Sequence, residues 1–180
     1  MRLRSSGTPL AGGDAKAAEL TAVRLLARRE HTREELRRKL LDKGYAPEIV
    51  EPVIEKLAGK RLVSDDRYIS SFVHAHSRRG HGPTRIRAEL RQRGIEATRV
   101  EEEFERAGVD WVALAAQVRR RKFGAAAPKS LTERAKQSRF LQYRGFEADQ
   151  IRAALSPDAG LSGDADGIAP HVVDEGLDPD

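Results

Sequence analysis

The feature that most constrains this chain is an internal repeat of about 50 residues. When the sequence is shifted by 50 positions, apolar residues coincide with apolar residues, and an Arg-Arg pair, a histidine and a glycine each recur. A further shift of 51 positions repeats the pattern once more, with a gap at residues 124–130. A period of this length is typical of small supersecondary units that bury a core only by joining their neighbours. The coincident pairs include Val23 with Val73, Arg28 with Arg78, Arg29 with Arg79, His31 with His81, Leu36 with Ile86, Leu40 with Leu90, Gly44 with Gly94 and Val50 with Val100.

The repeat predicts an all-α chain of three tandem three-helix repeats. We expect them at residues 15–62, 63–108 and 109–155. Units this small bury little surface alone, so they should join end to end into an elongated, curved helical array rather than a globe. The flanking residues, an arm at 1–14 and a tail at 156–180, hold few large apolar groups and are predicted to be disordered.

Start and stop signals support nine helices and no sheet. Thr32 followed by Glu35 forms a capping box ahead of an apolar stripe, and Ser64 can cap the helix that contains Tyr68. Pro47 and Pro83 occupy positions typical of a first helical residue, and Gly44, Gly94 and Gly145 follow basic stretches as C-terminal caps do. Pro52 conflicts with this pattern, because proline removes a hydrogen bond inside a helix. Either that helix is kinked or it begins near Glu51.

The charge is unevenly distributed along the chain. Lys and Arg number 33 and Asp and Glu 28, but seven of the acids lie in residues 156–180, which contain no Lys or Arg. The rest of the chain therefore has a net charge of +12. This favours a polyanionic partner, a tail that shields the basic body, or both, over a solvated charged surface. The chain has no Cys, no long apolar run and no secretion signal, so we expect a cytoplasmic protein without membrane contact.

No constellation in the sequence predicts catalysis. Two of the five histidines, His31 and His81, occupy equivalent repeat positions, which indicates a structural or binding role. His74 and His76 are two residues apart and face different sides of a helix, so they cannot share a metal, and His171 lies in the tail. The RGHGP segment lacks the pattern of a phosphate-binding loop. We therefore expect no catalytic residues, no cofactor and no metal site, and a protein that is not an enzyme.

A basic cluster in the second repeat is the strongest binding signal. Ile86 and Leu90 mark the buried side of a helix, while Arg87 and Arg91 share another ridge and are expected to be exposed. Ion pairs with Glu89 on that helix are the competing interpretation. Two further basic clusters, near Arg37 and at residues 119–122, are equally compatible with binding and with a solvated surface. The predicted partner-binding or DNA-binding residues are Arg78, Arg79, His81, Arg85, Arg87, Arg91 and Arg93.

Three strings carry a resemblance to a known family. They are LLARREHTREELRRKLLDKGY, LVSDDRYISSFVHAHSRRGHGPTRIRAELRQRGI, and RRKFG followed by RFLQYRGFEADQI, and together they cover about residues 17–155. The chain resembles the RecX family, bacterial modulators of the recombinase RecA. The resemblance implies a crescent of three three-helix repeats that docks into the groove of the RecA–single-stranded DNA filament. It implies inhibition of ATP hydrolysis, strand exchange and co-protease activity, in DNA repair and SOS control.

The resemblance also implies that the protein can bind DNA directly and carries no catalytic residues. The predicted basic residues match the family's basic motif, and a monomer is expected. Two other classes stay open on the sequence. One is a DNA-binding regulator of helix-turn-helix type, since three-helix units with a basic helix are common there. The other is an unrecognised enzyme.

Overall fold

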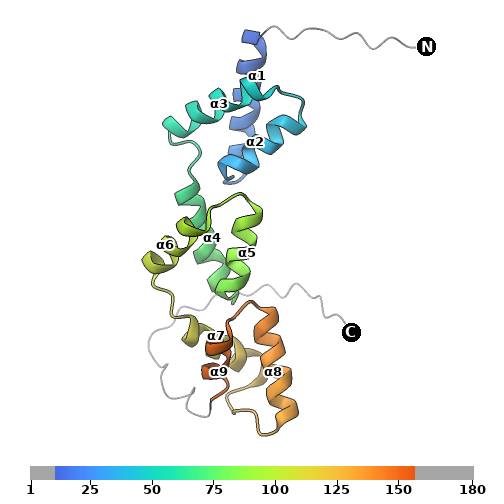
Figure 1. Ribbon diagram of the computed structural model, residues 1–180, viewed down its shortest axis with the longest axis vertical. Coiled ribbons are helices and arrows are strands. Elements are labelled where there is room, and N and C mark those ends of the chain that lie inside the picture. Colours follow the sequence, from blue (N-terminus) through green and yellow to red (C-terminus); the bar gives the residue numbers. More distant parts are fainter. Residues whose placement is uncertain (1–10, 157–180) are drawn as a thin grey trace, which may run out of the picture. The chain divides into compact units, whose positions relative to one another are not determined.

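The computed structural model describes residues 11–156, and within that range it contains nine α-helices and no strand (Figure 1). The predicted all-helical class is confirmed for the described residues. The helices are α1 (Ala11–Leu26), α2 (Arg33–Asp42), α3 (Pro47–Gly59), α4 (Asp65–Arg78), α5 (Pro83–Gln92), α6 (Ala97–Ala107), α7 (Trp111–Phe123), α8 (Leu131–Tyr143) and α9 (Ala148–Ala154).

The predicted helix boundaries have the expected capping chemistry. The Thr32 side chain accepts a hydrogen bond from the Glu35 amide at 3.0 Å, and the Arg67 amide donates to Ser64 Oγ at 3.3 Å. Each bond satisfies an amide that a helix start leaves without a partner. Gly94 and Gly145 leave their helices with φ of +79° and +90°, a left-handed conformation that other residues adopt at a cost.

Two details of the helix prediction are corrected. Helix α1 begins at Ala11, so residues 11–14 are helical rather than part of a disordered arm; the rest of that arm, and the tail beyond Ser156, lie outside the described residues. Helix α3 runs from Pro47 through Pro52, so a start near Glu51 is wrong. Pro52 is exposed, and the helix buries Val53 and Leu57 beside it, which offsets the missing hydrogen bond.

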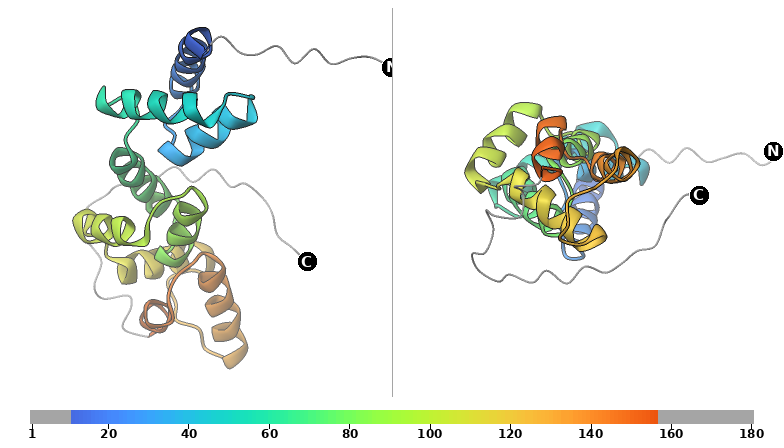
Figure 2. Two further views of the ribbon diagram at one scale, coloured as in Figure 1. Left: turned by 45° about the horizontal axis from the view of Figure 1, so that its top comes forward. Right: turned by 90° about the horizontal axis from the view of Figure 1, so that it is seen from below.

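The first three helices and the last three each pack as a triplet with its own small core; we call α4, α5 and α6, which lie between them in the sequence, the second triplet. Helices α1, α2 and α3 contact one another, and so do α7, α8 and α9, which lie side by side in Figures 1 and 2. The first core contains Leu36, Leu40 and Ile54, all fully buried. The last contains Leu141 and Phe146. The third helix of a triplet thus closes the apolar faces of the first two.

By compactness the described chain divides into two units. The first ends at Ile69 and also contains Arg91–Glu96; the second contains Ser70–Leu90 and the helices from Ala97 onward. The repeat limits of 15–62, 63–108 and 109–155 stay a prediction. None of the helices in the described range is long and apolar enough to cross a membrane.

Candidate functional site

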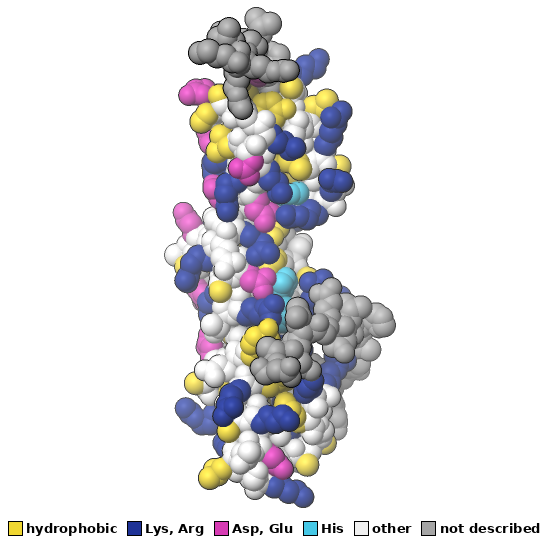
Figure 3. Space-filling view, turned by 90° about the vertical axis from the view of Figure 1, so that its right-hand side faces the viewer, with side chains coloured by type: hydrophobic (Ala, Val, Ile, Leu, Met, Phe, Trp, Pro, Cys, Tyr) yellow, Lys and Arg dark blue, Asp and Glu magenta, His cyan; other side chains and the backbone are white. Residues whose placement is uncertain are grey.

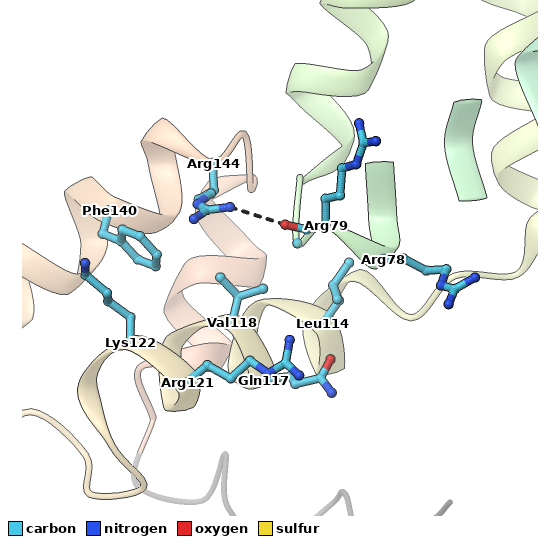
Figure 4. A pocket seen from close by; sticks show the side chains of 10 residues that line it. Arg78, Arg79, Leu114, Gln117, Val118, Arg121, Lys122, Phe140 and Arg144 are labelled. Carbon is cyan, nitrogen blue, oxygen red and sulfur yellow. Dashed lines mark hydrogen bonds between the residues drawn. The ribbon is translucent and has the colours of Figure 1, made fainter. Parts of the chain in front are cut away.

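The second unit contains a basic pocket of about 370 Å³ (Figure 4). Its walls come from the end of α4, from α7, and from α8 with the residue that follows it. Leu114, Val118 and Phe140 supply apolar side chains to it. The cationic lining residues, which we call the pocket cations, are Arg78, Arg79, Arg121, Lys122 and Arg144.

Two loops bring these walls together through their backbones. The Gly82 amide donates to the carbonyl of Arg144 at 2.8 Å, and the Thr84 amide donates to the carbonyl of Gly145 at 3.0 Å. A Cβ on Gly145 would lie 2.6 Å from the Arg85 amide nitrogen, a distance that real Cβ atoms essentially never show. The glycine therefore permits the close approach of the first turn of α5 to the loop after α8.

Gly80 makes a second close approach at the pocket wall. Its φ is +76°, and a Cβ there would lie 2.7 Å from Val118 Cγ2. The chain can turn out of α4 and still touch α7 only because this position lacks a side chain. The glycines of the RGHGP segment thus serve a joint between helices, which agrees with its interpretation as an interhelical loop.

The pocket cations differ in how they are held. Arg144 donates from Nη1 to the Arg79 carbonyl at 3.2 Å and lies 5.4 Å from the centre of the Phe140 ring, so its position is fixed. The other four form no ion pair with a carboxylate of residues 14–156. Their charges are available to an external anion.

The sequence predicts binding residues from Arg78 to Arg93, and the structure gives two of the arginines on α5, Arg85 and Arg87, partners within the chain. Arg87 binds Glu101 with two hydrogen bonds of 2.7 and 2.9 Å, also pairs with Glu147, and lies 4.9 Å from the centre of the Phe104 ring. The hydrogen bonds to Glu101 raise the pKa of Arg87. Its side chain is 32% exposed, so the expectation that it projects freely into solvent is wrong.

The repeat identifies this pair as a structural element. Fifty residues earlier, Arg37 binds Glu51 in the same way, at 2.6 and 2.9 Å, and its other guanidinium nitrogen pairs with Glu34. In both triplets the arginine of the second helix therefore ties down the third helix. Arg87 is the counterpart of a residue that holds its own triplet together.

The remaining predicted residues divide between the two units. Arg78 and Arg79 are exposed and line the pocket, while Arg85 pairs with Glu89 at 2.9 Å, as the competing interpretation of the sequence expected. In the first unit, Arg91 is exposed as predicted, and Arg93 pairs with Glu35 at 3.5 Å.

His81 is partly buried against another histidine. Its Nδ1 lies 3.0 Å from Nδ1 of His76. Burial, followed by the positive charges of Arg85 and other nearby groups, lowers the pKa of His81 to about 4. The ring is therefore neutral at physiological pH and adds no charge to a basic surface.

The net charge shows what the sequence interpretation missed. The three predicted repeats, at 15–62, 63–108 and 109–155, carry net charges of +4, +1 and +6, so the favoured site lay in the least basic repeat. In the third, Arg119 is buried and donates to the carbonyls of Ala126 and Ala125 at 2.8 and 3.1 Å, whereas the next basic residues reach the pocket. In Figure 3, acidic side chains lie beside many of the basic ones in the upper part of the drawn face, and fewer acidic side chains are seen in its lower part.

Three family models match the chain. They describe the first, second and third three-helix domains of RecX and match residues 18–57, 64–102 and 109–155. A protein of Halorhodospira halophila named "Regulatory protein RecX" is 49% identical over 146 residues, which cover 81% of this chain and 91% of that protein. One of the same name from Pseudomonas savastanoi pv. phaseolicola is 44% identical over 144 residues, covering 80% and 93%.

Solved structures agree on the fold. RecX from Lactobacillus salivarius gives a TM-score of 0.71 at 21% identity, over 80% of this chain and 96% of that one. A second crystal structure, of a regulatory protein RecX, gives 0.67 at 23% identity, over 81% and 78%. Together, the three domain matches in chain order and the extent of the similarity show that this chain belongs to the RecX family.

Proposed function

We propose that this protein regulates the recombinase RecA by binding the RecA–single-stranded DNA filament. The binding lowers DNA-dependent ATP hydrolysis, strand exchange and co-protease activity, as part of the control of DNA repair and the SOS response. Membership of a family of regulatory proteins supports the general role. The observation that carries the proposal is the basic pocket, where four cations that pair with no carboxylate of the described residues surround apolar side chains.

The composition of the pocket favours a protein segment as its ligand. Arginine pairs well with carboxylates because its planar guanidinium donates two parallel hydrogen bonds. The side chains of Leu114, Val118 and Phe140 provide an apolar surface that a bare phosphate backbone would leave uncovered. An acidic segment of RecA with an apolar side chain next to its carboxylates satisfies both parts of the pocket.

The test is the DNA-dependent ATPase of the cognate RecA, measured against increasing concentrations of this protein. The pocket variant Arg121→Gln with Lys122→Gln removes two exposed charges. The matched control, Lys136→Gln with Arg139→Gln, removes the same charge from exposed positions of α8 that do not line the pocket. If each lost contact is worth about 1 kcal/mol, the pocket variant needs at least about tenfold more protein for half-inhibition.

The outcomes separate the function from the site. A parent protein without effect on the ATPase contradicts the proposed function. A parent that inhibits, together with a pocket variant that inhibits equally well, contradicts only the role of the pocket. Circular dichroism of each variant confirms that helicity is retained.

The net charge of +6 in the third repeat keeps a second function open, a DNA-binding regulator of helix-turn-helix type. Its signature is binding to bare duplex DNA with a sequence preference and a steep salt dependence. Equal affinity for unrelated duplexes contradicts it. We propose that the protein acts as a monomer in the cytoplasm, makes direct contact with single-stranded DNA where the filament exposes it, and catalyses no reaction itself.

A further inference from the structure

Three side chains that can bind a metal converge in the second triplet. His76 Nδ1 lies 3.0 Å from His81 Nδ1 and 3.8 Å from Glu89 Oε2. One ligand atom from each of the three residues lies within 4.8 Å of the others. The spacing of His74 and His76 does not reveal this cluster, because the partner of His76 is His81, which approaches only when the chain turns back after α4.

Neighbouring groups hold the cluster in place. The His76 ring stacks on Phe72, with ring centres 3.8 Å apart, and its side chain is only 13% exposed. Glu89 accepts a hydrogen bond from Arg85 through Oε1 at 2.9 Å, which turns Oε2 toward His76. Two of the three donors are therefore oriented by contacts that do not involve the donor atoms themselves.

The repeat provides an internal comparison. Fifty residues earlier, the three positions hold Leu26, His31 and Lys39, of which only the histidine can bind a metal. There the His31 Nδ1 is 2.9 Å from the carbonyl oxygen of Arg29, an ordinary local hydrogen bond. The first triplet thus folds without the other two donors, so the packing of a triplet does not require His76 or Glu89 at these positions.

We propose that His76, His81 and Glu89 bind one Zn²⁺ ion through their Nδ1, Nδ1 and Oε2 atoms. Two imidazoles and one carboxylate form a donor set typical of zinc. Ligands about 2.0–2.1 Å from a tetrahedral ion are about 3.3 Å apart. The separations of 3.0 and 3.8 Å are close to this value, and the third, which is within 4.8 Å, closes by side-chain rotation. Water completes the fourth position.

The protonation states suit this role. Burial, together with Arg85, His76 and Arg144, lowers the pKa of His81 to about 4, so its ring is neutral at pH 7. Binding through Nδ1 requires that each neutral ring carry its proton on Nε2. The nearby Arg85 and Arg144 oppose a cation, and Glu89 offsets one of these charges.

Metal binding would couple directly to the pocket. The ion connects α4, the loop at residue 81 and α5, and that loop carries Gly80 and Gly82, which contact α7 and the residues after α8. A crosslink here stiffens the wall that presents Arg78 and Arg79. This consequence holds whatever ligand the pocket takes.

The test is a calorimetric titration of the full chain, free of any affinity tag, with ZnCl₂ at pH 7.5, repeated with Co²⁺ to record its visible absorption. We expect one ion per chain and the intense visible bands of tetrahedral Co²⁺. Glu89→Gln and His81→Asn should each weaken binding by at least about tenfold. The matched control His74→Asn, an exposed histidine on the same helix, and His171→Asn in the tail should bind as the parent does.

Two results would overturn the proposal. One is the absence of saturable binding by the parent. The other is binding that survives in the double variant His81→Asn with Glu89→Gln but is lost in His74→Asn or His171→Asn. Because Glu89 is near the surface and glutamine has the same shape, the Glu89→Gln arm stays informative if a histidine variant folds poorly.

Discussion

Replacing Arg87 by methionine tests the conclusion that this residue holds the second triplet together. Methionine keeps most of the apolar stem and removes the guanidinium that pairs with Glu101 and Glu147. Arg91→Met is the matched control, because Arg91 lies one turn further on the same helix and is exposed. The comparison isolates the guanidinium contacts from the effect of adding a methionine to the helix.

The magnitude follows from exposure and geometry. Glu101 and Glu147 are 48% and 40% exposed, so solvent weakens both pairs, and about 0.5–1 kcal/mol each is appropriate. The contact of the guanidinium with the Phe104 ring adds about 0.5 kcal/mol. The sum is about 2 kcal/mol, which for a chain of this size lowers the melting temperature by about 4–8 °C.

The assay is thermal unfolding followed by circular dichroism, with urea unfolding as a second measure. Arg91→Met should change the free energy of unfolding by less than about 0.5 kcal/mol. The difference between the two variants should shrink in about 1 M salt, which screens partly exposed charges. If Arg87→Met and Arg91→Met have the same melting temperature, the ion pairs of Arg87 contribute nothing measurable to stability, and the structural role assigned to Arg87 is refuted.

Three further predictions concern acid, a glycine joint and the tail. Because the pKa of His81 lies below its usual value, its neutral ring stabilises the fold above pH 6.5, and this contribution is lost as the pH falls toward about 4. Between pH 7 and 5 the melting temperature of the parent should therefore fall more than that of His81→Asn. Equal falls in the two proteins would contradict this. Gly145→Ala should lower the free energy of unfolding clearly more than Gly44→Ala does, because both glycines have φ near +90° but only a Cβ at position 145 meets another residue. Equal free energies of unfolding for the two variants would contradict the clash. Deleting residues 156–180 should tighten DNA binding at low salt, with a gain that shrinks near physiological salt as charges are screened, and equal low-salt affinity counts against a shielding tail.

The fold was predictable because its signals are local. A cap such as Thr32 and a C-terminal glycine such as Gly94 act within one helix turn, and the apolar stripe of a helix recurs every three or four residues. The repeat then supplied the grouping in threes. Pro52 was ambiguous because the cost of a proline is local, while the burial of Val53 and Leu57 that offsets it depends on packing.

The site was less predictable because charge alone does not reveal pairing. Arg87 looks like a surface arginine until Glu147, 60 residues away, is brought against it. Arg119 and Arg121 are two residues apart in one basic run, yet the first is buried on loop carbonyls and the second lines the pocket. The two rings of the His76–His81 pair meet only because the chain reverses at Gly80.

The loop contact at Gly145 has a consequence for how such a chain can change over time. It is made from backbone hydrogen bonds and the lack of one Cβ, and a related contact in the first unit joins the Thr32 side chain to the carbonyl of Arg93 at 2.8 Å. Because such a contact depends on the backbone, most of the side chains around it can change without breaking it. Duplicated triplets can therefore acquire different charges, +4, +1 and +6 here, without losing their means of attachment, so that one copy can specialise in holding a partner while the others continue to support it.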